Sequence, residues 1–188
     1  MRRGFIKQIA QEFQPVLEHL KFLDEFGVNL GLTRLYGRAA PGERVPEATP
    51  GYSGSHYTVV ALMGLTGLEA PLIFEGAMSQ LVFESYVEQM LVPAVRPGDK
   101  LIIDNLAAHK SQKANDLIEA CGARLVFLPP YSPDLNPIEK CWSKVKTALR
   151  AAKARTFDAL VEALATALRS VSLADIESWF AHCGYALA

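Results

Sequence analysis

Three acidic residues, Asp24, Asp104 and Glu139, stand where side chains from separate elements could converge. Asp24 is expected to end a first strand, Asp104 ends the apolar run KLIID, and Glu139 opens a helix behind a proline-rich loop. Carboxylate oxygens suit Mg²⁺ or Mn²⁺, and two such ions about 4 Å apart can flank an in-line displacement at phosphorus. Acids clustered without a metal ion would repel one another and raise one another's pKa values. The three acids therefore favour metal-dependent phosphoryl chemistry.

Each of these acids also has an interpretation that involves no catalysis. Asp24 and Asp104 stand at expected strand ends, where aspartate is common in turns. The segment from Asn136 through Pro137 to Glu139 has the spacing of a capping box, with the three residues at N-cap, N1 and N3. Such a cap stabilises a helix by about 1 kcal/mol. From the local sequence alone, the cap is the favoured interpretation of Glu139.

Motifs for other catalytic chemistries are not found. GYSGS, at residues 51–55, is not the G-x-S-x-G nucleophile elbow, and no phosphate-binding or dinucleotide-binding glycine motif occurs. The four histidines lack the H-x-x-x-H spacing of a helical metal site. His109, in DNLAAHKS, follows the strand that carries Asp104, so it could orient a ligand or a phosphate, although a lone loop histidine more often does neither.

A basic tract follows Glu139. Residues 140–155 contain six positive charges and no acid, namely Lys140, Lys144, Lys146, Arg150, Lys153 and Arg155. Trp142, Val145 and Leu149 are spaced to form the inward side of this helix, which leaves the basic residues mostly outward. A solvated helix face and a surface that contacts DNA phosphates both remain open as interpretations.

Hydrophobic periodicity indicates the elements that must position these residues. Strands are expected within residues 22–30, 56–65, 70–76, 100–105 and 123–129, and helices within 79–92, 111–121, 137–151, 157–170 and 173–183. The first strand is expected to end in a turn at Gly27. Ser111 and Thr156 are expected to cap their helices, and residues 41–54 to form a loop.

The order of these elements predicts a mixed sheet. Strands separated by helices pair in parallel, while the closely spaced early strands form antiparallel hairpins. Active groups in such sheets gather beyond the carboxyl ends of parallel strands, which places Asp104 and the loop after residue 128 at one edge.

Composition restricts the class of protein. A chain of 188 residues fits one domain, and its net charge of −1 requires any nucleic-acid contact to come from a local patch. Three widely spaced cysteines suit reduced thiols rather than disulfides or a zinc site. No signal peptide and no membrane-spanning run is found, which favours a soluble intracellular protein.

The acids lie in motifs that can be recognised together. LDEFG (23–27), LIIDNLAAHKS (101–111) and LPPYSPDLNPIEKCWSKVK (128–146) resemble the catalytic domain of bacterial insertion-sequence transposases of the mariner superfamily. The 34 residues between Asp104 and Glu139 are the spacing typical of that group. The resemblance extends from about residue 20 to AHCGY near the end of the chain.

The resemblance implies an α/β, ribonuclease-H-like fold: a mixed five-stranded sheet with helices on both faces. It implies a DDE triad of Asp24, Asp104 and Glu139 that binds two divalent ions, Mg²⁺ or Mn²⁺. It implies strand cleavage at transposon ends and strand transfer into target DNA, commonly at a TA dinucleotide. Supporting roles fall to Asn105, His109 and Asn136, and DNA binding to Lys140, Lys144, Lys146 and Arg150. DNA is the implied partner of a homodimer in the bacterial cytoplasm, associated with the nucleoid.

The chain departs from the family pattern at two places. Phe26 stands where the family usually has Ser or Thr, which could disturb packing near Asp24. Only about 20 residues, an N-terminal extension at 1–20, precede the expected catalytic domain at 21–188, and no helix-turn-helix region is found in them. The missing region could be a separate product joined by frameshifting. Two alternatives remain: an inactive, truncated fragment that regulates transposase by dimerising with it, and another ribonuclease-H-like nuclease such as a junction resolvase.

Overall fold

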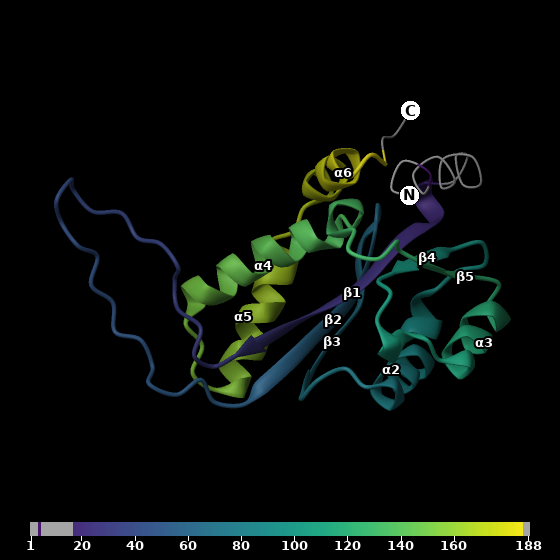
Figure 1. The fold of residues 1–188 in the computed structure, drawn as a ribbon, viewed down its shortest axis with the longest axis horizontal. Coiled ribbons are helices and arrows are strands. Elements are labelled where there is room, and N and C mark those ends of the chain that lie inside the picture. Colours follow the sequence, from purple (N-terminus) through teal and green to yellow (C-terminus); the bar gives the residue numbers. More distant parts are fainter. Residues whose placement is uncertain (1–3, 5–16, 186–188) are drawn as a thin grey trace.

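A single mixed sheet forms the centre of the molecule (Figure 1). The computed structural model describes residue 4 and residues 17–185. Its strands are β1 (Leu20–Asn29), β2 (His56–Gly64), β3 (Gly67–Glu75), β4 (Lys100–Ile103) and β5 (Arg124–Phe127). They lie in the order β3-β2-β1-β4-β5, with β1, β4 and β5 parallel and β2 antiparallel to both of its neighbours. The predicted mixed five-stranded sheet is therefore confirmed.

Helices cover both faces of this sheet. They are α2 (Gln80–Tyr86), which continues as a π-helical turn (Val87–Leu91) and a 3₁₀ turn (Val92–Ala94), then α3 (Gln112–Ala120), α4 (Ile138–Ala152), α5 (Phe157–Arg169) and α6 (Leu173–His182). One hydrophobic core joins α4, α5 and α6 to the sheet, and a second joins α2 and α3 to its other face. None of the described helices has the length and apolar character needed to cross a bilayer.

Alternation along β1 sends neighbouring side chains into different cores. Phe22 packs edge-on against Phe180 of α6, and Phe26 lies 4.8 Å, centroid to centroid, from the buried ring of Trp142 in α4. Leu23 belongs to the core beneath α2 and α3. Asp24 therefore faces α4 while Glu25 faces α2 and α3. The unusual Phe26 is a core residue that anchors α4 on the central strand.

Two predictions about β1 are wrong. The strand does not end at Gly27 but continues to Asn29, because β2 pairs with it along its whole second half, with Gly27 opposite Thr58. Asp24 accordingly lies in the middle of β1 rather than at its end. It comes just after the last residue that pairs with β4, since that parallel ladder runs only from Leu20 to Phe22.

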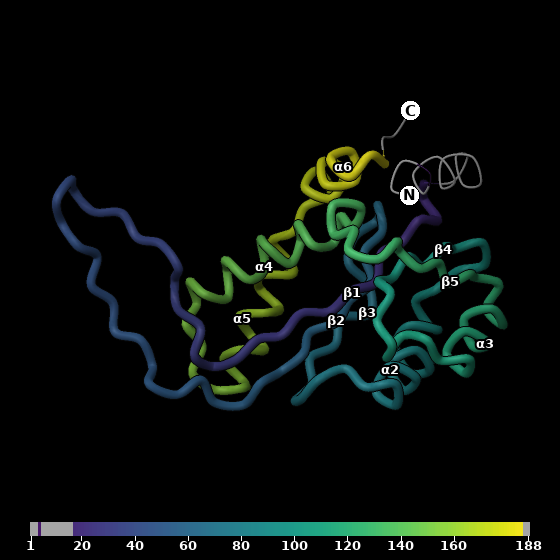
Figure 2. Tube along the Cα trace, viewed as in Figure 1, coloured from purple at the N-terminus to yellow at the C-terminus, as the bar shows by residue number. Residues whose placement is uncertain are grey.

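The predicted loop between the first two strands is confirmed and is long. Residues 30–55 extend well away from the sheet before the chain returns in β2 (Figure 2). The predicted helix caps are also confirmed, because the side chains of Ser111 and Thr156 accept hydrogen bonds from the first turns of α3 and α5. All three cysteines are free.

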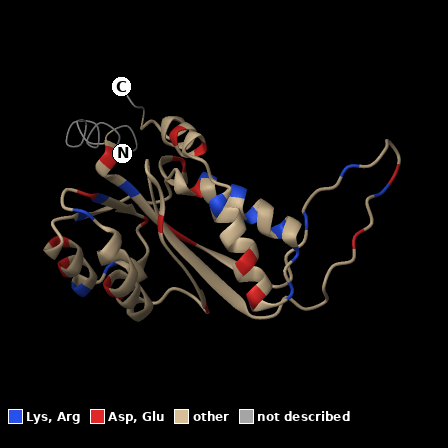
Figure 3. Ribbon diagram, turned by 180° about the vertical axis from the view of Figure 1, so that it is seen from behind, with Lys and Arg blue, Asp and Glu red and all other residues tan. Residues whose placement is uncertain are grey.

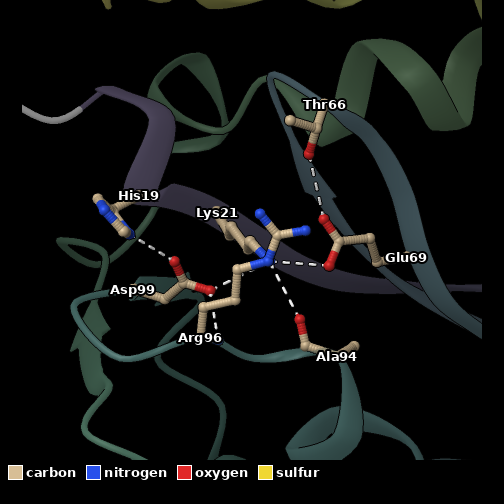
Figure 4. A network of polar contacts seen from close by, with 7 residues as sticks. All are labelled: His19, Lys21, Thr66, Glu69, Ala94, Arg96 and Asp99. Carbon is tan, nitrogen blue, oxygen red and sulfur yellow. Dashed lines mark hydrogen bonds and ion pairs between the residues drawn. The ribbon is translucent and has the colours of Figure 1, made fainter.

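A buried ion-pair network fastens the start of β1 to its surroundings (Figure 4). The Lys21 side chain is only 3% exposed, and its Nζ lies 2.8 Å from Glu69 Oε2 and 3.1 Å from Asp99 Oδ2. The same ammonium donates to the carbonyl oxygen of Ala94. His19 Nδ1 lies 2.9 Å from the other oxygen of Asp99. The network joins β1, the β2–β3 hairpin and the turn that precedes β4.

Asp99 is held in its charged form by this network. Burial alone raises the pKa of the Asp99 carboxyl, but hydrogen bonds from the Arg96 backbone N–H, His19 and Lys21 outweigh burial and lower the pKa below its usual value. Each oxygen of Asp99 therefore has a donor, and the carboxylate is buried together with its counter-charge.

Candidate functional site

Three carboxylates from three separate elements line one pocket of about 420 Å³. Asp24 comes from the middle of β1, Asp104 follows the last residue of β4, and Glu139 lies in the first turn of α4. The parallel pairing of β1 and β4 brings the first two acids to the same edge. The sequence-based prediction that these acids converge agrees with this geometry.

The loop between β5 and α4 forms another wall of the pocket. Its lining residues are Leu128, Pro129, Pro130, Tyr131, Ser132, Pro133 and Asn136. A short 3₁₀ turn, Pro133–Leu135, carries the chain from this loop to the start of α4. Tyr185 fixes the turn from behind, since its hydroxyl donates to the carbonyl oxygen of Leu135 over 2.8 Å. The prolines therefore set the direction in which α4 leaves the pocket.

Asp24 carries the least compensated charge in the site. Its side chain is 7% exposed. Burial raises the pKa of the Asp24 carboxyl well above its usual value, and repulsion from Glu139, Glu25 and Asp104 raises it further. The side-chain amide of Asn136 donates to Asp24 Oδ2 over 3.3 Å, which is a weak compensation for a buried carboxylate.

The predicted capping box at the start of α4 is wrong. Helix α4 begins at Ile138, Pro137 occupies the N-cap position, and no side chain caps the helix. Asn136 cannot serve as the cap because its amide is turned to Asp24 in the sheet. The backbone N–H of Glu139 is bonded to the Asn136 carbonyl oxygen, and the Glu139 side chain is exposed at the pocket. The capping interpretation of Glu139 is thereby removed.

Asp104 is fixed by two donors on one of its oxygens. Oδ1 accepts a hydrogen bond from the backbone N–H of Leu106 over 3.1 Å and lies 2.7 Å from His109 Nδ1. The His109 ring is 1% exposed and packs against Phe83 at 4.8 Å between ring centroids. Its other nitrogen, Nε2, lies 3.3 Å from Glu25 Oε2, within ion-pair distance but outside hydrogen-bond geometry. His109 therefore stands between two carboxylates.

The two carboxylates change the acidity of this histidine. Burial alone lowers the pKa of His109, but the hydrogen bond with Asp104 and the interactions with Glu25 outweigh it and raise the pKa to about 9. The residue was predicted to have a supporting role, and it contacts Asp104 directly. Glu25 lies on the far side of that ring.

The donors around the pocket suit a hard divalent cation. Asp24, Asp104 and Glu139 supply carboxylate oxygens, and Asn136 Oδ1 is buried beside them without a hydrogen-bond partner. Within the described residues, no three His, Cys, Asp or Glu side chains converge tightly enough to enclose one ion. Mg²⁺ is usually bound through one or two protein carboxylates, with water or phosphate oxygens completing its shell.

Basic residues recur along α4 (Figure 3), and their surroundings differ. Lys140 is exposed beside Glu139, and Arg150 is half-buried. Lys144 Nζ lies 2.7 Å from Asp175 Oδ2 in α6 and 2.9 Å from the carbonyl oxygen of Ser170. Lys146 Nζ lies 5.0 Å from the centroid of the Phe26 ring. Two of the four predicted DNA contacts thus already bind groups within the domain.

The end of the basic tract holds the long loop in place. Lys153 forms an ion pair with Glu47, which lowers the pKa of the Glu47 carboxyl. Arg155 donates to the carbonyl oxygens of Leu30 and Leu32. These side chains tie residues 30–55 to the end of α4, a role that the sequence did not indicate.

Several residues that were not selected as site residues also line the pocket, among them Leu106, Lys110 and Tyr131. All three lie within the recognised motifs, and that position is the signal that could have found them. Tyr131 is 94% exposed and has a left-handed backbone with φ of 54°, an uncommon conformation for a residue with a side chain. Its exposed ring lies at the rim of the pocket.

A family model identifies the class to which this fold and site belong. Residues 19–161, about three quarters of the chain, match the DDE superfamily endonuclease model. The chain belongs to the DDE superfamily endonuclease family. The matched segment includes all three pocket acids.

Known relatives agree with this assignment. The Mos1 transposase in its paired-end complex with the left transposon end has a TM-score of 0.75 at 14% identity, over 97% of this chain and 57% of that one. The Mos1 transposase catalytic domain, solved with Raltegravir and Mg, has a TM-score of 0.69 at 11% identity, over 97% and 90% of the two chains. The predicted ribonuclease-H-like fold is thereby confirmed.

A curated insertion-element protein also matches part of the chain. The "Insertion element IS630 uncharacterized 39 kDa protein" of Shigella sonnei is 29% identical over 103 residues, which are 54% of this chain and 30% of that protein. The chain thus spans less than a third of this relative and little more than half of the first transposase. The predicted DDE class is confirmed by the family model, and the predicted fold by the solved structures.

Proposed function

We propose that this domain cleaves DNA strands at transposon ends and transfers the freed ends into target DNA. The proposal assigns Asp24, Asp104 and Glu139 as ligands of two divalent ions, Mg²⁺ or Mn²⁺. The observation that carries it is the convergence of three carboxylates on one pocket. No Lys or Arg among residues 17–185 forms an ion pair with Asp24 or Glu139, so a bound cation would balance negative charge that these basic side chains leave unpaired.

The proposed reaction consists of two displacements at phosphorus. In the first, the oxygen of water forms a bond to phosphorus and the bond to the 3′ oxygen breaks, which leaves a 3′-hydroxyl at the transposon end and a 5′-phosphate on the other side. In the second, that 3′-hydroxyl attacks a target phosphodiester and expels a new 3′-hydroxyl. One phosphodiester replaces another, so no nucleotide cofactor is needed. Bound divalent ions supply activation of the attacking oxygen and stabilisation of the departing one.

The side chains of the pocket would position the reactants. Asp24, buried and restrained by Asn136, gives the site one rigid ligand, while exposed Glu139 can adjust to the ion and the DNA. Asn105 and Lys110, on the loop after β4, line the same pocket and are placed to contact a phosphate. The site therefore combines a fixed inner wall with an adaptable rim.

DNA would approach along the exposed start of α4. Lys140 is next to Glu139 and exposed, so we assign it a phosphate contact, with Arg150 further along the helix. Lys144 and Lys146 would reach DNA only by leaving their contacts with Asp175 and Phe26. The four basic residues should therefore contribute unequally to DNA affinity.

The direct test combines the purified protein, Mn²⁺ or Mg²⁺, and a pre-nicked duplex with the terminal sequence that flanks its gene. Strand-cleavage and joining products are resolved on a denaturing gel. Asp104→Ala should abolish both products, and unchanged product formation in this variant would reject the assignment. A four-way junction serves as the competing substrate, because preferential cleavage of the junction would indicate a resolvase instead.

A further inference from the structure

The His109 ring links the two parallel strands of the site beyond the point where their backbones pair. The ladder between β1 and β4 ends at the pair Phe22–Ile102. Past it, His109 Nδ1 lies 2.7 Å from Asp104, which follows β4, and Nε2 lies 3.3 Å from Glu25 of β1. The side chain thus replaces missing backbone hydrogen bonds as the connection between the strands at the pocket.

The contacts of Asp104 distinguish its two oxygens. Oδ1 receives the hydrogen bonds from the Leu106 N–H and from His109, while Oδ2 makes neither contact. A carboxylate with two donors on one oxygen cannot rotate about its last torsion without breaking both bonds. Oδ2 is consequently the oxygen that remains for a ligand in the pocket that Asp104 lines.

The surroundings of the ring fix its own orientation. His109 is 1% exposed, and its ring packs against Phe83 of α2. Glu25 is 13% exposed and faces the ring from the side of the sheet opposite to Asp24. A buried ring held between an aromatic side chain and a carboxylate has little freedom to turn away from Asp104.

We propose that His109 is a positioning residue that holds Asp104 Oδ1 and thereby presents Oδ2 to a divalent ion, with Glu25 as the support of the ring. This inference rests on the proposed function, since it assumes that Asp104 is a ligand. Side chains that orient a metal ligand typically change metal affinity by about 10- to 100-fold when they are replaced. Glu25 is thus a fourth acid near the site, one that acts through a histidine and not on the ion.

Two substitutions of His109 separate the contacts of its two nitrogens. In His109→Asn, the amide nitrogen occupies the place of Nδ1 and can still donate to Asp104. In His109→Gln, the amide nitrogen occupies the place of Nε2 and can reach Glu25 only. His182→Asn, at the exposed end of α6, is the matched control.

The readout is Mn²⁺ binding to the purified protein, measured from the electron paramagnetic resonance signal of free Mn²⁺. We expect His109→Gln to weaken Mn²⁺ binding by about tenfold or more, and His109→Asn by about threefold at most. The Mn²⁺ concentration that gives half-maximal strand cleavage should change in the same order. Equal Mn²⁺ affinities in the two variants, whether both wild-type or both reduced, would overturn the positioning role.

Asp104→Asn distinguishes failure of this inference from failure of the proposed function. Loss of Mn²⁺ binding in Asp104→Asn, with both His109 variants unaffected, rejects the positioning role alone. Wild-type binding in Asp104→Asn rejects the metal site itself. If a His109 variant does not fold, Glu25→Ala and Glu25→Gln replace the pair. Glu25→Ala should weaken Mn²⁺ binding severalfold. Glu25→Gln retains an acceptor for the ring and should bind Mn²⁺ as the wild type does. Wild-type Mn²⁺ binding in both variants would overturn the inference.

Discussion

Two clusters of acidic side chains flank the short stretch over which β1 and β4 pair, and they differ in how their charge is balanced. Before that stretch, buried Asp99 and partly buried Glu69 share the ammonium of Lys21. Beyond it, Asp24 and Glu139 have no Lys or Arg partner within the described residues. The pKa of Asp99 is lowered and that of Asp24 is raised. The Lys21 cluster therefore includes its own cation, whereas Asp24 and Glu139 have none in the part of the chain that the structure describes.

This difference in charge balance indicates which of the two clusters stabilises the fold. Burying a carboxylate with a cation and hydrogen bonds can offset its desolvation, whereas burying it among other carboxylates opposes folding. The Lys21 cluster joins three segments of the chain, so its loss should affect stability. The pocket acids should instead lower stability and be needed for chemistry. Four substitutions or conditions test this contrast.

The largest effect is expected for Asp24→Asn. We expect strand cleavage to fall by about 10³-fold, since metal-mediated charge stabilisation amounts to several kcal/mol. The melting temperature should stay equal or rise, because a buried, repelled charge is removed while Asn136 keeps an acceptor. Gel assays and thermal denaturation measure the two quantities, with the exposed Asp116→Asn as control. A lower melting temperature would show that the fold depends on this charge.

Lys21→Met should have the opposite effects: it should lower stability and leave strand cleavage unchanged. Removal of the ammonium leaves Asp99 and Glu69 without their cation, and breaking a buried ion pair in this way costs about 3 kcal/mol or more of unfolding free energy. Cleavage per folded molecule should not change. Urea denaturation measures the loss, and Lys113→Met, which removes an exposed pair with Glu88, should cost close to nothing. Equal effects of the two variants would contradict the contrast.

The pH dependence of stability should show the contribution of Asp99. Because its folded pKa is lowered, its contribution is fully present above the unfolded pKa of about 4 and is lost as the pH falls through the folded value. The difference in urea midpoint between wild type and Asp99→Asn should therefore shrink as the pH is lowered from 5 towards 2. A difference in urea midpoint that grows on acidification would show that Asp99 stabilises the fold in its protonated form instead.

The smallest effects are expected on α4. Lys140→Ala should weaken DNA binding and reduce the slope of log affinity against log salt concentration by about one, because one phosphate contact is lost. Lys144→Ala should leave that slope unchanged and lower stability by at most about 1 kcal/mol, since its pair with Asp175 is partly exposed. Fluorescence anisotropy over a salt series measures the slope, and thermal denaturation measures the change in stability. A reduced slope in Lys144→Ala would assign it to the DNA surface.

The sequence predicted the elements well because their signals are local. Strand and helix periods, the caps at Ser111 and Thr156, and the loop at 41–54 all depend on neighbouring residues. The end predicted at Gly27 failed because pairing with β2 overrides the local preference of glycine for turns. Local signals therefore give the order of elements but not where each one ends.

The sequence was less informative about the site because the decisive contacts are remote. Asn136 was expected to cap α4, yet its amide serves Asp24, which is 112 positions away in the chain. The partner of Lys144 lies 31 residues further on, in α6, so a tract that looks uncompensated is partly neutralised by folding. Strand alternation places Glu25 on the face of β1 opposite to Asp24, but it does not show that a histidine lies beside Glu25 on that face.

The hydrogen bond between Asn136 and Asp24 also bears on when the site forms during translation. β1 is the first strand of the sheet to leave the ribosome, and it can form its hairpin with β2 and β3 while the rest of the chain is still being translated. Asp104 and the start of α4 follow much later. A nascent chain that ends after β3 therefore contains Asp24 without either acidic partner, and the proposed DNA-cutting site comes into being only once translation has passed α4.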